Sequence, residues 1–199
     1  METYIILIII ITLLYFFWVS YYIYDENIYV ISDIDNNSYL IRRGRNKSKI
    51  FLKNSADTLA IINKRIMSLI NKLYENPNKY YFIKYLKNNY NASKISEAAY
   101  DTNYTTYTIN KNDMHICLRT RDRNEDLYDI DLLMYVVLHE LAHMGNYDNN
   151  TPIQGHGDSF KHIFNILVTE SINMNLYNYK NYRESPVEYC GIVLNSSII

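Results

Sequence analysis

The chain has few of the residues that mark several common protein classes. Its 199 residues include only two cysteines, three prolines and five glycines. Two cysteines are too few for a disulfide scaffold, and Cys117 and Cys190 are not clustered as in a zinc knuckle, so a reducing compartment is the default expectation. The formal net charge of −1 excludes a strong overall attraction to nucleic acid. The length allows one domain plus an attached segment, but not two sizeable domains.

Charge is absent from one long stretch at the N-terminus, residues 4–24. At 1.5 Å per residue this stretch would span about 30 Å, the thickness of a bilayer core. A cleaved signal peptide is the alternative, but a basic start and a small-residue cleavage site are both missing. We therefore predict an uncleaved transmembrane anchor over residues 4–24 and a single-pass membrane protein. The basic residues that follow favour a cytosolic location for the rest of the chain.

Residues 25–54 are polar and charged, and they are predicted to form a juxtamembrane linker with two short strands, Tyr29 to Ser32 and Tyr39 to Arg42. A basic run from Arg42 to Lys49 is the main charge patch of this segment. It is suited to attraction by anionic headgroups, and a solvated linker or topology signal is an equally good interpretation. Contact with DNA is the weakest of the three. The globular domain is predicted over residues 55–199.

Hydrophobic periodicity predicts an α+β domain. A helix capped by Ser55 or Asp57 is expected to end at Asn76-Pro77, with a second, shorter helix over residues 79–88. The buried stripe of the first helix comprises Leu59, Ile62, Ile66, Leu69, Ile70 and Leu73. Two strands, residues 104–109 and 114–119, flank a turn, and two more helices are expected around residues 131–145 and from about 157 to 175.

The most informative motif is His139-Glu140-Leu141-Ala142-His143. Two histidines four residues apart lie on one helix face with Cβ atoms ~5–6 Å apart, so both imidazoles reach one ion. The glutamate between them points at a neighbouring angle, from which it contacts a water molecule on that ion. An apolar run precedes the motif and Gly145-Asn146 follows it, as expected for a buried helix that ends there. The motif predicts a catalytic zinc site.

A third histidine, His156, is expected to complete this site. It lies between Gly155 and Gly157, which permit a tight backbone path toward the metal. Three protein ligands leave the fourth position open, which distinguishes a catalytic zinc from a closed structural one. We therefore predict one Zn²⁺ held by His139, His143 and His156, with Glu140 as the catalytic base.

Other residues are weaker candidates for the site. Phe160 is expected to pack the second helix against the first, and His162 to lie on the surface or behind a ligand. His115 is better explained as a plain strand residue than as a contact of the metal, and Cys190 is better explained as a buried thiol than as a fourth ligand. An oxyanion donor is not evident, although Tyr177, Tyr179, Tyr182 and Tyr189 are candidates, and Asp158 or Glu170 is suited to orienting a ligand imidazole.

The strand from Met114 to Arg119, the motif V-V-L-H-E-L-A-H-M and the segment G-H-G-D-S-F-K-H-I-F together resemble the WLM and SprT-like metallopeptidases, the group that includes Spartan. The ending S-P-V-E-Y-C-G is similar to the tail of WLM-like proteins of large DNA viruses. The resemblance implies a minimal zincin, a small antiparallel sheet with an edge strand beside the active-site helix. It also implies His139, His143 and His156 as zinc ligands and cleavage of proteins, notably those crosslinked to DNA. This chain departs from the family in its predicted anchor and in lacking an appended zinc finger.

These observations predict a membrane-anchored zinc metallopeptidase that acts on protein or peptide substrates. The strand from Met114 to Arg119 would pair with an extended substrate backbone. Two alternatives stay open, a protease of the kind that clears DNA-crosslinked proteins and a catalytically silent zinc-bound scaffold. Nucleic acid is a weak partner candidate because the net charge does not support it, and the oligomeric state is not indicated.

Overall fold

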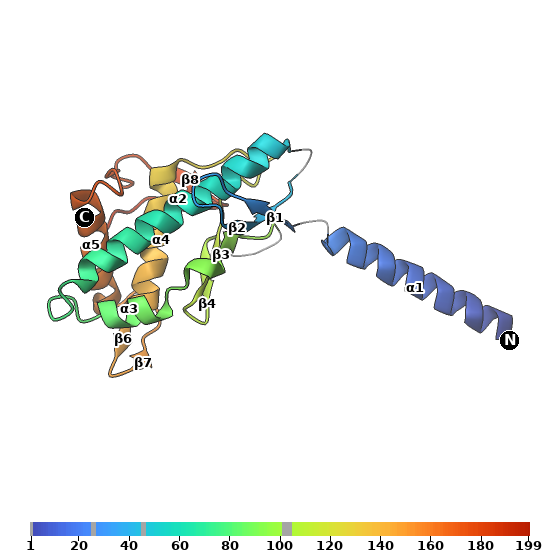
Figure 1. The fold of residues 1–199 in the computed structure, drawn as a ribbon, viewed down its shortest axis with the longest axis horizontal. Helices are drawn as coiled ribbons and strands as arrows, with labels where there is room; N and C mark the ends of the chain where they lie inside the picture. Colours follow the sequence, from blue (N-terminus) through green and yellow to red (C-terminus); the bar gives the residue numbers. More distant parts are fainter. Residues whose placement is uncertain (1, 25–26, 45–46, 101–104) are drawn as a thin grey trace.

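The computed structural model describes residues 2–24, 27–44, 47–100 and 105–199. It contains a folded α+β body from which the N-terminal helix α1 (Glu2–Tyr24) extends away (Figure 1). Three further long helices build the body, namely α2 (Lys49–Tyr74), α4 (Ile130–Gly145) and α5 (Asp158–Asn173). The shorter helix α3 (Ile83–Asn89) packs against both α2 and α4. The α+β class predicted for the domain is confirmed.

The predicted transmembrane helix and the single-pass membrane localisation are wrong. Residues 2–24 do form one helix, and its apolar side chains are exposed from Tyr4 to Trp18. Within the part of the chain that the structure describes, however, no helix combines the length and the apolarity needed to cross a bilayer.

The segment expected to be a linker forms a hairpin that packs on the body. Strands β1 (Asn27–Ile31) and β2 (Ser38–Arg42) pair antiparallel, close to the two predicted strands. Ile41 of β2 is fully buried, and Ser32 donates a hydrogen bond to Asp57 of α2 at 2.6 Å. Asp57 therefore ties the hairpin to α2 instead of capping that helix.

The basic run does not form one solvated patch. Arg42 is only 3% exposed and lies 3.8 Å from Glu97 and 3.7 Å from Glu125. The fully buried Arg119 binds the same Glu97 carboxylate through Nε at 2.6 Å and Nη2 at 2.7 Å. A buried, paired guanidinium is not available to headgroups or DNA, so neither use applies to Arg42. Arg45 lies outside the described residues.

Helix α2 contributes many of the buried side chains of the core. It begins earlier than predicted, because Ser48 accepts a hydrogen bond from the backbone N–H of Phe51 and so caps the helix in place of Ser55 or Asp57. It ends at Tyr74, just before Asn76-Pro77, as predicted. The predicted stripe is buried to 2% exposure or less: Leu59, Ile62, Ile66, Leu69, Ile70 and Leu73.

A small sheet lies beside α4, and it is mixed, so the expectation of a purely antiparallel sheet is wrong. Its order is β3 (Ile95–Glu97), β5 (Asp113–Ile116) and β4 (Tyr107–Ile109), with β5 parallel to β3 and antiparallel to β4. The predicted strand pair is thus present, although Tyr104 lies outside the described residues. The prediction that Met114 to Arg119 forms the edge strand is wrong, since β5 is bonded on both sides. Among the described strands, β4 is the edge on the side of α4.

The C-terminal segment is bonded covalently to the sheet. It forms a hairpin of β8 (Val187–Tyr189) and β9 (Ile192–Leu194). Cys190, in the turn between these strands, forms a disulfide with Cys117. The Tyr189 hydroxyl is fully buried and donates to the carbonyl of Cys117 at 2.9 Å. The two cysteines are therefore not free thiols, and Cys190 has no thiolate to offer a metal.

Opening this disulfide should weaken the fold without abolishing it. The bond closes a loop of 73 residues, and cross-links of that kind typically stabilise by about 2–4 kcal/mol, mainly through the unfolded chain. We expect the free energy of unfolding, measured by urea titration, to fall by about that amount when a phosphine reductant is added. The double variant Cys117→Ser/Cys190→Ser should show the same loss and no response to reductant. An identical urea midpoint with and without reductant would contradict a stabilising role for the bond.

Candidate metal and catalytic site

Helix α4 carries the first two histidines on one face. Asp129 caps its N-terminus, because the Asp129 carboxylate accepts hydrogen bonds from the backbone N–H groups of Asp131 and Leu132. Its other faces are buried in the core, with Leu138, Leu141 and Ala142 fully inaccessible to solvent. His139 and His143 are partly exposed, so the helix is held by its apolar sides and presents its imidazoles toward the surface.

The third histidine returns to α4 through a hairpin of β6 (Tyr147–Asp148) and β7 (Thr151–Pro152). The backbone N–H of Ile153 donates to the carbonyl of Asn146 at 2.9 Å, which closes the hairpin against the helix end. Gly155 has φ of +78°, a left-handed conformation that favours glycine, and it turns the chain so that His156 faces α4. The glycine noted in the sequence therefore serves the predicted turn.

The three imidazoles converge on one point. The Nε2 atoms of His139, His143 and His156 lie 3.2, 3.1 and 3.0 Å from one another. Ligand nitrogens at 2.0–2.1 Å from a tetrahedral zinc ion are about 3.3 Å apart, so the observed spacing fits a shared ion. The structure thus brings together the three residues that the motif predicted.

Burial keeps the imidazoles of His139 and His143 uncharged. Desolvation, followed by the neighbouring histidines, lowers the pKa of His139 to about 3. Desolvation also lowers the pKa of His143 to about 4, with smaller contributions from His156 and Lys111. Because only a neutral imidazole binds a metal, the folded chain presents these two rings in their ligating form at neutral pH.

Phe160 on α5 fixes the orientation of the rings. It is 3% exposed, and its ring centroid lies 4.8 Å from His139, 4.3 Å from His143 and 4.7 Å from His156. The predicted packing role is therefore confirmed, and it extends beyond joining two helices. A rigid aromatic ring in contact with all three imidazoles restricts the rotamers that each can adopt.

Glu140 is buried beside the cluster. Its side chain accepts a hydrogen bond at Oε2 from Thr108 Oγ1 at 2.8 Å. Desolvation raises the pKa of Glu140 to about 7, and the Thr108 hydrogen bond opposes that rise. Thr108 belongs to the edge strand β4, and sequence reasoning missed it. The alternation along residues 107–109, which turns Thr108 away from its neighbours, was the available signal.

Several weaker candidates lie elsewhere. His115 stacks on Tyr107 at 4.8 Å and accepts or donates to Ser96 at 2.9 Å. His162 stacks on Tyr81, Asp158 is exposed near Lys161, and Glu170 accepts from the Tyr80 hydroxyl. The four tyrosines bind other partners or pack with other rings: Tyr177 with Lys180 N–H, Tyr179 with the Ile199 carbonyl, Tyr182 with the Tyr135 ring, and Tyr189 with the Cys117 carbonyl.

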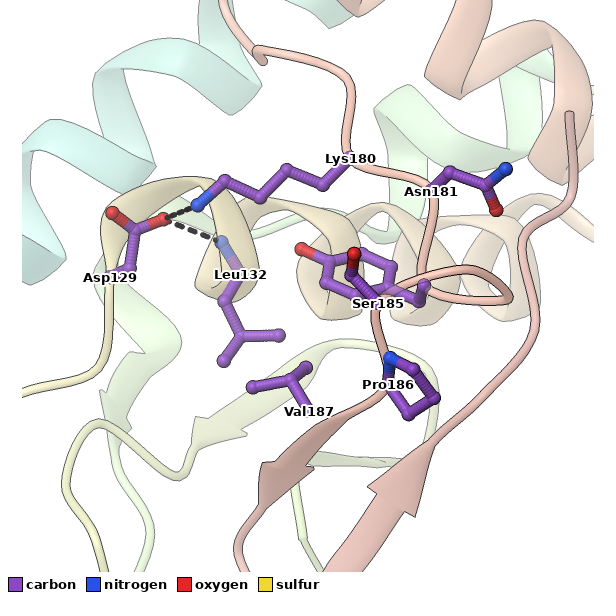
Figure 2. Close-up of a pocket in the computed structure, with 8 residues that line it drawn as sticks. Asp129, Leu132, Lys180, Asn181, Ser185, Pro186 and Val187 are labelled. Atoms are coloured by element: carbon purple, nitrogen blue, oxygen red, sulfur yellow. Dashed lines mark hydrogen bonds and ion pairs between the residues drawn. The ribbon is translucent and has the colours of Figure 1, made fainter.

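A separate pocket of about 460 Å³ lies at the other end of α4 (Figure 2). Its lining includes Asp129, Leu132, Lys180, Pro186 and Val187. The Lys180 ammonium is 2.6 Å from the Asp129 carboxylate, so it neutralises the cap of α4. The lining contains none of the three histidines, and Leu132 lies roughly 10 Å before His139 along the helix at 1.5 Å per residue, so the pocket is separate from the histidine site.

Comparisons with known proteins connect the whole chain to a viral protein. It is 38% identical over 209 residues to "Uncharacterized protein R325" of Acanthamoeba polyphaga mimivirus, and the match covers 100% of both chains. The chain belongs to the R325 family. No family model matches the sequence, and no solved structure matches it either. The likeness to WLM and SprT-like metallopeptidases therefore stays a prediction.

Two further relatives come from invertebrate iridescent viruses. Protein 042R of virus 3 is 41% identical over 83 residues, which are 39% of this chain and 48% of that protein. Protein 136R of virus 6 is 24% identical over 155 residues, covering 75% of this chain and 83% of that protein. Both names describe uncharacterized proteins, so these similarities assign no activity.

The geometry predicts which histidines bind zinc. Wild-type protein dialysed against trace zinc should retain about one ion per chain by mass spectrometry. His139→Ala, His143→Ala and His156→Ala should each weaken zinc binding by more than about 100-fold, since losing an outer partner alone costs about 10–100-fold. His115→Ala and His162→Ala are matched controls and should keep the ion. Full zinc content in His156→Ala would move the third ligand to another residue.

Proposed function

We propose that the chain is a zinc-dependent peptidase in which His139, His143 and His156 hold the ion and Glu140 is the general base. The observation that carries the proposal is the convergence of three Nε2 atoms within 3.2 Å of one another. A buried carboxyl side chain from the same helix turn accompanies that cluster. A zinc-bound water as nucleophile, Glu140 as base and the zinc ion as the group that polarises the carbonyl would then lie close together.

The donor set suits a catalytic zinc better than a structural one. Structural zinc sites use four protein ligands, whereas catalytic sites keep one position for water or substrate. Among the described residues, the cluster that can hold a metal consists of these three histidines alone. His156 is exposed, so the open side of the cluster faces solvent and admits a substrate.

The bound zinc would supply a water of lowered pKa and polarise the scissile carbonyl. Glu140 accepts a proton from the attacking water at a carboxylate oxygen and passes it to the leaving amine. A buried carboxyl group directly after a ligand on the same helix is placed to serve in both steps. Thr108 occupies one oxygen of this carboxylate, Oε2, and so leaves the other oxygen for the water.

The edge strand β4 favours an extended polypeptide as substrate. Its outer side is not bonded to another described strand, and Thr108 of the same strand contacts Glu140. A peptide that adds to this edge through main-chain hydrogen bonds would run past the carboxyl group. Recognition through the main chain predicts loose sequence preference. The substrate-binding strand is therefore β4 and not β5, because β5 is enclosed within the sheet.

The two alternative functions receive less support. A silent zinc scaffold would not need a buried glutamate held by a threonine from another element. A protease directed to DNA-crosslinked proteins would gain from a positive field, and the net charge is −1. Peptide hydrolysis without a nucleic-acid requirement is the function that the site supports best.

Replacing the base should separate metal binding from turnover. Glu140→Gln should keep zinc and lose about 10²–10⁴-fold in kcat, because an amide does not accept the proton. Cleavage of unfolded casein with and without a chelator measures this loss. Glu75→Gln, an exposed glutamate at the end of α2, is the control and should match wild type. Equal rates for Glu140→Gln and wild type would remove Glu140 from the mechanism.

Thr108 should affect the rate of catalysis through its hydroxyl group alone. Thr108→Val keeps the branched shape but removes the donor to Glu140, a hydrogen bond to a carboxylate worth about 1.5–3 kcal/mol, or roughly 10–100-fold in rate. We expect kcat to fall within that range while zinc content stays unchanged. Thr108→Ser should restore most of the activity. A fully active Thr108→Val would mean that Glu140 does not need this partner.

A further inference from the structure

The hairpin that carries Thr108 contacts α4 at a second point, through Lys111 in its turn. The Lys111 ammonium donates to the carbonyl oxygen of His143 at 2.6 Å and to that of Asn146 at 3.2 Å. It also reaches the carbonyl of Ile153 at 3.4 Å. The side chain is partly buried and crosses the ring of Tyr147, with the nitrogen 4.7 Å from the ring centroid.

These three carbonyls belong to the two segments that must meet at the metal site. His143 and Asn146 lie at the carbonyl end of α4, where the helix dipole places partial negative charge and favours a cation. Ile153 lies three residues before His156, in the loop that returns to the helix. One ammonium group therefore joins the element that bears His143 to the segment that bears His156.

The backbone of the turn suggests that lysine is present for its side chain. The Asn112 N–H donates to the Ile109 carbonyl at 3.1 Å, and the central residues Asn110 and Lys111 have φ of 50° and 58°. Turns with two positive φ values favour Asn-Gly, because glycine adopts this conformation without strain. A lysine at the second position is costly for the local backbone, and its contacts with the helix end offset that cost.

We propose that Lys111 is a positioning residue for the metal site. Its ammonium holds the end of α4 against the loop of residues 146–153 and so sets the distance between His143 and His156. The same hairpin fixes Glu140 through Thr108, so one structural unit aligns both the metal ligands and the base. This inference rests on the proposed zinc site, and it assigns a role to a residue outside the three ligands and the base.

Zinc affinity and cobalt spectra test the proposal directly. Lys111→Met keeps the apolar stem and removes the ammonium. Its zinc dissociation constant, measured by chelator competition, should rise about 10–100-fold, the usual effect of losing a partner behind a ligand. The visible absorption spectrum of the Co²⁺-substituted protein should change, because the ligand nitrogens move. Lys111→Arg, which retains a cation with several donors, should rescue most of both properties.

The chain offers a matched control on the other side of the same turn. Lys94 pairs with Asp113 at 2.7 Å, is exposed, and is not seen to bond to α4. Lys94→Met should therefore keep wild-type zinc affinity and spectrum. Thermal unfolding of the zinc-free proteins shows whether Lys111→Met acts beyond general stability, since a purely structural role would lower the melting temperature and leave the Co²⁺ spectrum unchanged.

The possible outcomes are distinct. Wild-type zinc affinity and an unchanged Co²⁺ spectrum in Lys111→Met overturn the positioning role and leave the proposed function intact. If Lys111→Met does not fold, Lys111→Gln takes its place under the same criterion, and failure of both to fold overturns the proposal in favour of a structural role. If the wild-type chain binds neither zinc nor cobalt, the zinc site itself fails, and the proposed function and this inference fall together.

Discussion

Three imidazole nitrogens that lie 3.0–3.2 Å apart impose the central constraint on this molecule. Three ring nitrogens this close together need a surrounding structure that holds each ring in place. The apolar sides of α4 hold two of them, and Phe160 contacts all three. The remaining ring depends on a loop, and the packing of that loop against the helix end decides whether the cluster forms.

The β4–β5 hairpin connects this cluster to the rest of the domain. Thr108 reaches the buried carboxyl group of Glu140, and Lys111 reaches the carbonyl end of α4. Two short polar contacts from one hairpin are directional, whereas apolar packing alone leaves a helix free to slide or rotate slightly. Directional contacts at both ends of the motif therefore restrain the helix in the way that a catalytic constellation requires.

The same sheet is anchored from its opposite end. The disulfide between Cys117 and Cys190 joins the C-terminal hairpin to the residue that follows β5, and the Tyr189 hydroxyl donates to the Cys117 carbonyl. Arg119 and Glu97 form a buried ion pair two residues farther along. The similarity to the mimivirus protein R325 covers both chains completely, so the relationship extends over the whole chain and not over a fragment alone.

The sequence alone determined the features that depend on neighbours along the chain. The His139 and His143 pair follows from helical periodicity, as does the buried stripe of α2, because residues three or four apart share a face whatever surrounds them. A third ligand at His156 was predicted from its flanking glycines, and the structure brings that ring to the other two. The apolar N-terminal residues correctly predicted a helix, whereas the prediction that this helix spans a membrane was wrong.

Only the tertiary structure decided which distant residues meet. The pairing of Cys117 with Cys190, the burial of Arg42 and the contacts of Thr108 and Lys111 join positions separated by tens of residues. The order of the sheet made β4 the edge strand in place of β5. No local pattern encodes these choices, since they arise from how helices and strands pack to bury apolar surface while pairing most of the polar groups that become buried.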